Sequence, residues 1–252
     1  MRRREERGAS SVQQDDTGPL LTLDRWGAHR LIRAVVGNVK VDLRQEFGDG
    51  IGSSLWPSSV VLGRHLLRRR ESEFAAPLRI LELGSGCGLT AITLSLMNAG
   101  NQVFATDKKA VLPLLRENVG LFLATMSQAG RAVGTVQVAE FDWFAFAPGM
   151  QLPVWSHALD LIVLSDCLYS SAAVAPLGDV LTALLLCPGN ERTRVVLANE
   201  RRTALDEFMS SCRRSGEGWH GRQLEVVRTG SERDLSIVPG LVVPVVVMAT
   251  QQ

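Results

Sequence analysis

The segment 79–107 combines glycines and carboxylates in a spacing that suits the binding of a nucleoside. An apolar run predicts a short strand containing Glu82, and a glycine-rich turn follows at Gly84, Ser85, Gly86, Cys87 and Gly88. Glycines in such a turn let the backbone bend sharply and approach a ligand without a clash from a side chain. A predicted helix and a second strand then lead to Asp107, where a carboxylate would meet the hydroxyls of a ribose.

The spacing of the glycines disfavours the two commonest nucleotide sites. A dinucleotide fingerprint has the form GxGxxG, but Leu89 occupies the position of its third glycine here. A P-loop requires a lysine after its glycines, and none follows them in this chain. Glu82 beside the turn would repel phosphate and would suit a ligand that carries an ammonium group. S-adenosyl-L-methionine has such an ammonium, a ribose diol and no phosphate, so we expect it as the cofactor and S-adenosyl-L-homocysteine as the product.

Polar residues also stand at the ends of the next two predicted strands. Asp142 and Trp143 follow one of these strands, and Ser165 and Asp166 follow the other. Ligands of open α/β sheets bind outside the carboxyl ends of the strands, so these side chains are expected to surround one site. Asp142 could accept from the adenine amino group, and Trp143 could either line the adenine ring or pack in the core.

Several short strings of the chain together resemble the family 16 group of the seven-β-strand (class I) methyltransferases, which contains many protein-lysine methyltransferases. The strings are ELGSGCG at 82–88, LWPSSVVL at 55–62, FDW at 141–143 and DCLY at 166–169. The resemblance extends over about residues 30–202 and includes Asn118. It implies a protein N-methyltransferase that acts on lysine, with a cofactor contacted by Trp56, Gly84, Ser85, Gly86, Asp107, Trp143 and Ser165. The chemistry of the residues adds Glu82 and Asp142 to that set.

The resemblance also implies that Asp166 and Tyr169 form the catalytic acceptor pocket. Asp166 would orient an amine at the strand tip, and the ring of Tyr169, one turn further on, would form a wall of the channel through which the amine enters. In-line methyl transfer chiefly requires a nucleophile held about 3 Å from the carbon, so no strong base is needed. An apolar, aromatic channel would favour the neutral form of a lysine, whose ordinary pKa is about 10.4. The alternative interpretations are an N-cap of the next helix for Asp166 and a half-buried surface aromatic for Tyr169.

Other acceptors remain open at this point. Methylation of adenine or glutamine nitrogens usually involves an Asn/Asp-Pro-Pro-Tyr/Phe string, and DCLY stands at that strand end here, which argues against nucleic acid. A methyltransferase of small molecules or of arginine or histidine side chains is one alternative. A non-catalytic scaffold that binds the cofactor is another. The string NERR at 199–202 could add acceptor contacts or cap the following helix.

The elements that position these residues alternate as in an α/β fold with a doubly wound, mostly parallel seven-stranded sheet, the Rossmann-like methyltransferase fold. Residues 30–36 and 39–44 predict an accessory β-hairpin around a Gly-Asn turn. The core strands are predicted over 79–83, 102–106, 135–141, 159–164, 194–198, 222–228 and 241–249, and the helices over 60–68, 89–97, 108–124, 174–186 and 203–212. Pro244 cannot donate to a sheet, so the last paired strand should begin at or after Val245 or bulge there.

The length of 252 residues suits a single methyltransferase domain over 19–252, divided into an accessory hairpin and loop (19–54) and a core (55–252). The polar residues 1–18 are predicted to form a disordered tail. Lysine and arginine number 27 against 26 aspartates and glutamates, so no overall field would attract nucleic acid or a membrane. The arginines at 68–70 indicate a solvated helix end.

The 4 cysteines lack CxxC spacing, so neither a metal site nor a disulfide framework is predicted. No segment combines the length and apolarity of a signal peptide or a membrane span. We therefore expect a monomer in the cytoplasm, with the nucleus as an alternative, whose partner is a protein substrate.

Overall fold

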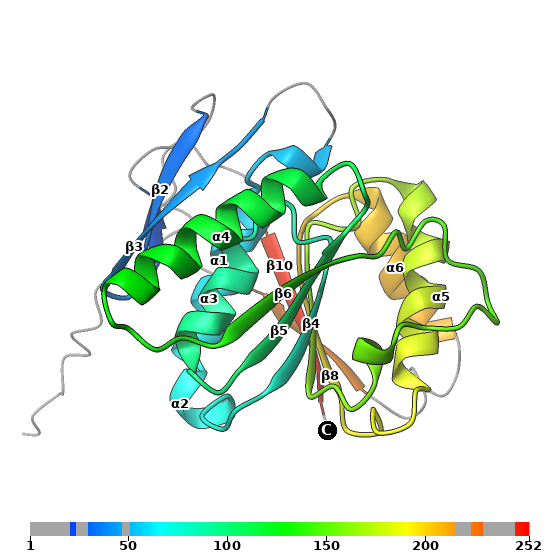
Figure 1. Ribbon diagram of the computed structural model, residues 1–252. Coiled ribbons are helices and arrows are strands. Elements are labelled where there is room, and N and C mark those ends of the chain that lie inside the picture. The colour runs from blue at the N-terminus through cyan, green and yellow to red at the C-terminus, as the bar shows by residue number, and fades with distance from the viewer. Residues whose placement is uncertain (1–20, 24–29, 47–50, 215–222, 229–244, 252) are drawn as a thin grey trace, which may run out of the picture.

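The computed structural model describes residues 21–23, 30–46, 51–214, 223–228 and 245–251. These residues form two sheets and the helices around them (Figure 1). The smaller sheet is antiparallel, in the order β1 (Leu21–Leu23), β2 (Leu31–Val36) and β3 (Val39–Arg44). The predicted tail, residues 1–18, lies outside the described residues.

The larger sheet has seven strands in the order β6-β5-β4-β7-β8-β10-β9. Its parallel part consists of β4 (Arg79–Leu83), β5 (Gln102–Asp107), β6 (Thr135–Glu140), β7 (Leu161–Ser165) and β8 (Arg194–Glu200). β10 (Val245–Gln251) runs antiparallel between β8 and β9 (Gln223–Arg228). The chain order reverses between β4 and β7, which is the point where open α/β sheets bind their ligands. The predicted doubly wound fold is confirmed.

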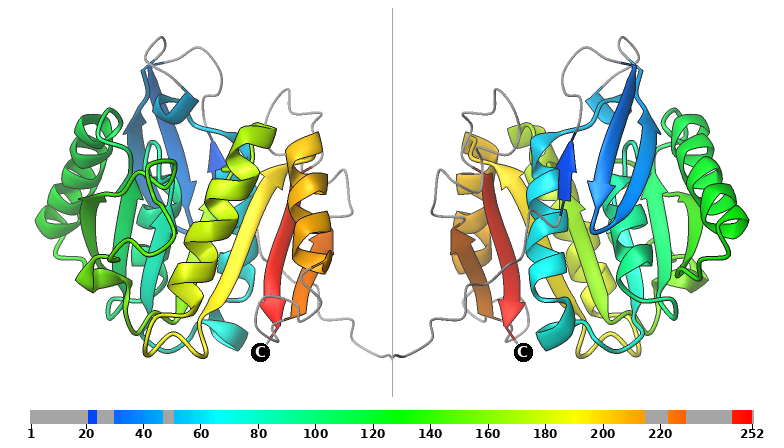
Figure 2. Two further views of the ribbon diagram at one scale, coloured as in Figure 1. Left: turned by 90° about the vertical axis from the view of Figure 1, so that its right-hand side faces the viewer. Right: turned by 90° about the vertical axis from the view of Figure 1, so that its left-hand side faces the viewer.

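Helices cover both faces of this sheet (Figures 1 and 2). One face carries α1 (Pro57–Arg68), α3 (Leu89–Met97) and α4 (Leu112–Gln128), and the other carries α5 (Val174–Leu185) and α6 (Thr203–Arg214). Each face has its own apolar core, centred on the leucines and valines of β4 and β7. The short elements are α2 (Arg70–Glu73) and the 3-10 helices η1 (Ile51–Ser53), η2 (Val154–Ser156) and η3 (Ser171–Ala173).

The predicted hairpin is present as β2 and β3. Val36 pairs with Val39 across the turn, and Gly37 has a φ of +58°, which the two-residue turn requires. The alternating side chains of β3 are buried and exposed in turn, and the buried ones pack with Phe122 and Met126 of α4. β1 was not predicted, because a strand of three residues is too short to show a pattern of alternating apolar and polar side chains.

Several element boundaries differ from the sequence-based expectation by one to four residues, and those of α4 and β8 are explained by contacts in the structure. α4 begins at Leu112 instead of 108 and ends at Gln128 instead of 124, because Val111 donates back to Lys108 in a turn that precedes the helix. β8 continues to Glu200 instead of ending at 198, because β10 pairs with its last residues. β10 begins at Val245, as Pro244 led us to expect, and the predicted residues 241–244 lie outside the described part.

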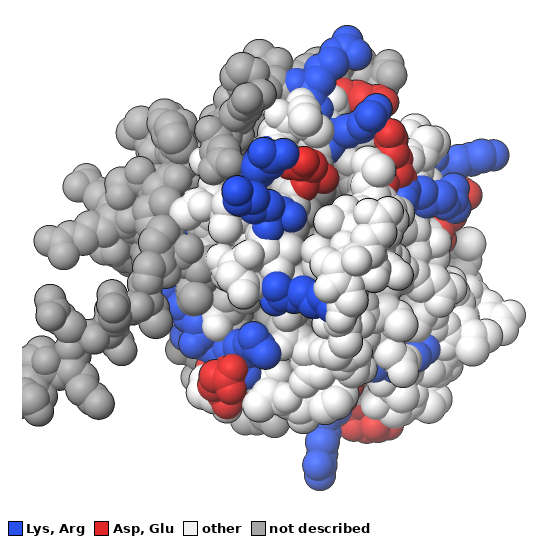
Figure 3. All heavy atoms as spheres, turned by 60° about the vertical axis from the view of Figure 1, so that its left-hand side comes forward, with Lys and Arg blue, Asp and Glu red and all other residues white. Residues whose placement is uncertain are grey.

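On the face drawn in Figure 3, basic side chains are spread over the described surface, and acidic side chains lie among them. Within the described residues, no helix combines the length and apolarity needed to cross a bilayer. The same residues contain no group of three or more metal-binding side chains.

Candidate active site

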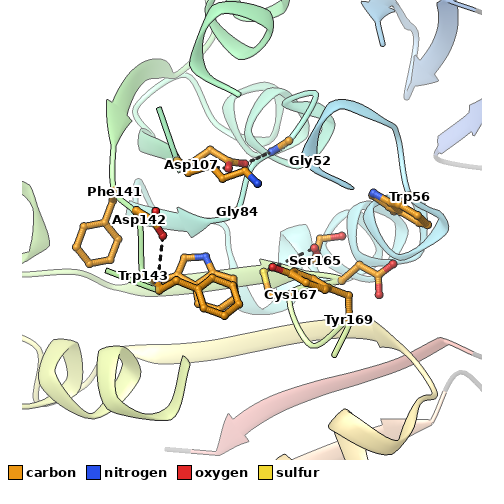
Figure 4. Close-up of a pocket in the computed structure, with 14 residues that line it drawn as sticks. Gly52, Trp56, Gly84, Asp107, Phe141, Asp142, Trp143, Ser165, Cys167 and Tyr169 are labelled. Atoms are coloured by element: carbon orange, nitrogen blue, oxygen red, sulfur yellow. Dashed lines mark hydrogen bonds between the residues drawn. The ribbon is translucent and has the colours of Figure 1, made fainter. Parts of the chain in front are cut away.

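A pocket of about 280 Å³ opens at the carboxyl ends of the parallel strands (Figure 4). It brings together nine of the eleven predicted site residues, namely Trp56, Gly84, Gly86, Asp107, Asp142, Trp143, Ser165, Asp166 and Tyr169. The other two, Glu82 and Ser85, are buried and do not line it. Sequence reasoning missed five lining residues, which are Gly52, Lys108, Phe141, Phe144 and Cys167.

The glycine turn and the tip of β5 are tied together by the carboxylate of Asp107. The backbone amide of Gly86 donates to one of its oxygens at 2.8 Å, and the amide of Lys108 donates to the other at 2.8 Å. Burial raises the pKa of Asp107, and these two amides oppose the rise. Each carboxylate oxygen keeps a lone pair for a further donor, so the residue is fixed in place to accept the two hydroxyls of a diol.

The turn itself depends on glycine at positions 84 and 86. Their φ angles are +71° and +53°, a left-handed conformation that residues with a Cβ rarely adopt. A Cβ at Gly86 would lie 3.1 Å from the carbonyl oxygen of Gly52, and one at Gly84 would lie 3.0 Å from Sγ of Cys167. The backbone can therefore come close to a ligand only because these two residues have no side chain.

Glu82 is buried directly behind this turn, with 1% of its surface exposed. Burial raises its pKa to about 8, and the nearby hydroxyls of Ser85 and Thr90 oppose the rise without reaching good hydrogen-bond geometry. Within the described chain, Glu82 Oε2, Ser85 Oγ and Ser165 Oγ have no hydrogen-bond partner. A ligand with an ammonium group would supply the donors that Glu82 lacks. The residues present therefore fit the expected cofactor.

Aromatic rings form another wall of the pocket. Trp143 is buried in the core on one side and lines the pocket on the other, so its packing in the core is confirmed and its contact with adenine stays a prediction. Its ring stacks on Phe144 with centroids 4.3 Å apart, and Phe144 lies 6.3 Å from Tyr169. Phe144 is 43% exposed, which is unusual for a ring of its size. Asp142 Oδ1 accepts from the amide of Phe144 at 3.0 Å and so fixes the turn that presents this ring.

Asp166 occupies the tip of β7 in a left-handed conformation with a φ of +56°. Such a conformation in a residue other than glycine costs on the order of 1–3 kcal/mol and persists only where the surroundings enforce it. The backbone amide of Asp166 donates to Ala198 of β8 at 2.8 Å, and Nη1 of Arg202 donates to its carboxylate at 2.6 Å. The N-cap interpretation is wrong, because η3 is preceded by Ser170.

The loop after Asp166 is held by the end of β8. Asn199 is fully buried, accepts from the amide of Leu168 at 2.9 Å and donates to the carbonyl of Glu200 at 2.8 Å. Tyr169, which follows, is partly buried, and burial raises the pKa of its hydroxyl. Cys167 donates to the carbonyl of Leu83, and burial raises the pKa of its thiol above the usual range, so it remains protonated.

Figure 4 shows Asp107 across the pocket from Trp143 and Tyr169, with Trp56 towards its other end. The residues predicted to bind a nucleoside and the pair Asp166 and Tyr169 thus line one pocket. Such an arrangement can hold an adenosine derivative on one side and present a second molecule to it from the other.

Comparison with known proteins agrees with this geometry. A family model described as lysine methyltransferase matches residues 36–215 of the chain. The protein-lysine N-methyltransferase EFM6 of Saccharomyces cerevisiae is 24% identical over 179 residues, which cover 66% of this chain and 71% of that protein. The protein N-lysine methyltransferase METTL21A of Mus musculus is 32% identical over 163 residues, covering 61% of this chain and 64% of that protein.

Solved structures show the same fold. The human methyltransferase 10 domain containing protein superposes with a TM-score of 0.51 at 11% identity, over 83% of this chain and 89% of that one. The matches to curated relatives span between 34% and 71% of the relatives' own length.

Proposed function

The chain belongs to the lysine methyltransferase family, and from that premise we propose that it transfers a methyl group from S-adenosyl-L-methionine to a lysine side chain of a protein substrate. The observation that carries this proposal is the shared opening of the pocket. Asp107, which would bind the diol, lines the same pocket as Asp166 and Tyr169, and the orphaned carboxylate of Glu82 is buried beside the glycine turn.

The residues divide the work of binding. Asp107 would accept the ribose hydroxyls, and Glu82 in its ionised form would accept the ammonium of the amino acid part. Asp142 and Trp143 would contact the adenine, the former through its carboxylate and the latter through its ring. Trp56 and Ser165 would line the remaining side of the cofactor. The cofactor, when bound, supplies a methyl group on a positively charged sulfur, which an amine lone pair attacks as the carbon–sulfur bond breaks.

The acceptor half would align the amine and keep it neutral. A lysine has an ordinary pKa of about 10.4, and the aromatic rings of Phe144 and Tyr169 provide a poorly hydrated channel that disfavours the ammonium. Asp166 would accept a hydrogen bond from the neutral amine and so direct its lone pair. The amine proton that leaves after transfer passes to water.

The test uses labelled S-adenosyl-L-methionine with cell lysate and compares the wild type with Asp107→Ala and Asp166→Ala. We expect label in a protein band that yields methyllysine on hydrolysis, and loss of that label in both variants. Label confined to low-mass material, or to methylarginine or methylhistidine, would refute the proposed acceptor. Cofactor binding without any transfer would refute the proposed activity.

A further inference from the structure

The carboxylate of Asp166 is already paired with a cation of the same chain. Nη1 of Arg202 donates to Oδ1 of Asp166 at 2.6 Å, and the amide of Glu200 approaches the same oxygen at 3.4 Å. Nη2 of Arg202 pairs with the carboxylate of Glu200. The Asp166 side chain is only 3% exposed, and in the described part of the chain its second oxygen, Oδ2, accepts no hydrogen bond.

We propose that Arg202 is a positioning residue that makes the acceptor site selective for a lysine amine over an arginine guanidinium. It does so by occupying one oxygen of Asp166 and offsetting its charge. The inference rests on the proposed function, because it concerns the acceptor half of the same pocket.

The first reason is geometric. An incoming guanidinium binds a carboxylate best through two parallel hydrogen bonds, which use both carboxylate oxygens. Arg202 and the backbone of β8 already use Oδ1, so only Oδ2 is left for a substrate. One acceptor atom is enough for an amine that donates a single hydrogen bond.

The second reason is electrostatic. A lone carboxylate beside a lysine would favour its ammonium form, which has no lone pair for the methyl group. The guanidinium of Arg202 opposes that effect and also repels a substrate guanidinium, which cannot lose its charge. Glu200 in turn pairs with Arg202 and so orients the guanidinium group of Arg202 towards Asp166. The trio keeps one net negative charge, which Arg202 spreads over two carboxylates, so Asp166 attracts an ammonium less strongly than a lone carboxylate would.

Other ionisable groups surround the pocket and must be counted. Asp107, Lys108, Asp142, Cys167 and Tyr169 line it, and Glu82 is buried behind it. Among the side chains of the described residues, Arg202 is the one that donates a hydrogen bond to the Asp166 carboxylate. A change at Arg202 should thus alter the acceptor half without altering the cofactor half.

The test measures ligand binding and so does not require the protein substrate. The probes are S-adenosyl-L-homocysteine and two analogues with nitrogen in place of sulfur, one carrying an alkyl arm that ends in an amine and one an arm that ends in a guanidine. Titration calorimetry at pH 6.5 and 8.5 would compare the wild type with Arg202→Met and Arg202→Lys. The matched control is Arg201→Met, because Arg201 is exposed and immediately adjacent in the chain.

In the wild type we expect the amine arm to improve affinity over S-adenosyl-L-homocysteine by about tenfold at pH 8.5 and by less at pH 6.5, and the guanidine arm to give no gain. Arg202→Met should gain about fivefold for the guanidine arm and lose the pH dependence of the amine arm. Arg202→Lys should restore part of that pH dependence, and Arg201→Met should match the wild type.

The inference is overturned if the wild type binds both arms equally well. It is also overturned if Arg202→Met weakens all three ligands by the same factor, which is the result expected of a purely structural residue. Failure of the proposed function would appear separately, as the absence of methyllysine in the lysate assay with the wild-type protein.

Discussion

Replacing Glu82 with glutamine should make the protein more stable and at the same time weaken its binding of the cofactor. The ordinary pKa of this carboxyl is 4.5, and burial raises it to about 8 in the folded protein. The folded state therefore holds the proton over a range in which the unfolded chain releases it. Below about pH 4.5 the carboxyl is protonated in both states, so its raised pKa does not reduce the unfolding free energy. As the pH rises from 4.5 towards 8, only the unfolded chain ionises readily, and the unfolding free energy falls.

The size of the effect follows from the two pKa values. At pH 7 the unfolded carboxyl lies 2.5 pH units above its pKa of 4.5, whereas the folded one is still mostly protonated. At 1.36 kcal/mol per unit, ionisation favours unfolding by up to about 3 kcal/mol at pH 7 and by about 1 kcal/mol at pH 5. Glu82→Gln removes this penalty, so the gain in unfolding free energy should be larger at pH 7 than at pH 5.

Binding should change in the opposite direction. An ammonium ligand requires the ionised form of Glu82, so the affinity of the wild type for S-adenosyl-L-homocysteine should rise about ninefold from pH 6 to 7 and about fivefold from pH 7 to 8. The glutamine variant should bind more weakly and show little dependence on pH in this range.

Denaturant titrations at pH 5 and 7 and calorimetry from pH 6 to 8 would measure both effects. The matched control is Glu140→Gln, which removes an exposed carboxylate at the end of β6 and should change neither quantity. The reasoning fails if Glu82→Gln gives the same stability change at both pH values, or if wild-type affinity is flat between pH 6 and 8.

Substitutions at three further positions, with a control in α4, probe the glycine turn, its support and the aromatic wall. Gly86→Ala places a Cβ 3.1 Å from a carbonyl oxygen at a residue with a φ of +53°, so the affinity for S-adenosyl-L-homocysteine, measured by calorimetry, should fall at least about tenfold. The control is Gly120→Ala in α4, where the added Cβ meets no atom within 4 Å. This variant should raise the unfolding free energy by about 0.5–1 kcal/mol. Asn118→Ala removes three hydrogen bonds that join α4 to β3 and the glycine turn. Denaturant titration should therefore show an unfolding free energy lower by about 2–4 kcal/mol, and a decrease below about 1 kcal/mol would contradict this. Tyr169→Phe keeps the ring and should retain transfer within about threefold, whereas Tyr169→Ala should lower kcat by about tenfold or more with little change in cofactor binding. Equal loss in both tyrosine variants would show that the hydroxyl, not the ring, matters.

Local signals predicted the elements that carry the cofactor half of the site. The glycine turn, the helix after it and the strand that leads to Asp107 each have their own periodicity or turn chemistry, and α3 lies where the pattern placed it. The hairpin was predictable for the same reason. α4 began later than expected because its start depends on a turn after Asp107, and Asp107 is itself held by the backbone of Gly86.

Contacts between distant segments explain what the sequence did not reveal. The end of β8 depends on its pairing with β10, about 50 residues later, and no local pattern marks it. Phe144 follows the Asp-Trp pair, and its residue type alone suggests a core position. The hydrogen bond from its amide to Asp142 fixes the turn that presents its ring to the pocket. Arg202 has one weak local signal, because it belongs to the NERR string that follows a predicted strand.

The conformation of Asp166 connects these observations. A residue with a Cβ adopts a φ of +56° only where its neighbours compensate for the strain, and here the compensation comes from β8 through Ala198 and from Arg202. A glycine would relieve the strain but would remove the carboxylate that pairs with Arg202. The DCLY string supplies that carboxylate, and the adjacency of β7 and β8 supplies the cation that pairs with it. The proposed acceptor half of the pocket is therefore a property of two strand ends rather than of one motif.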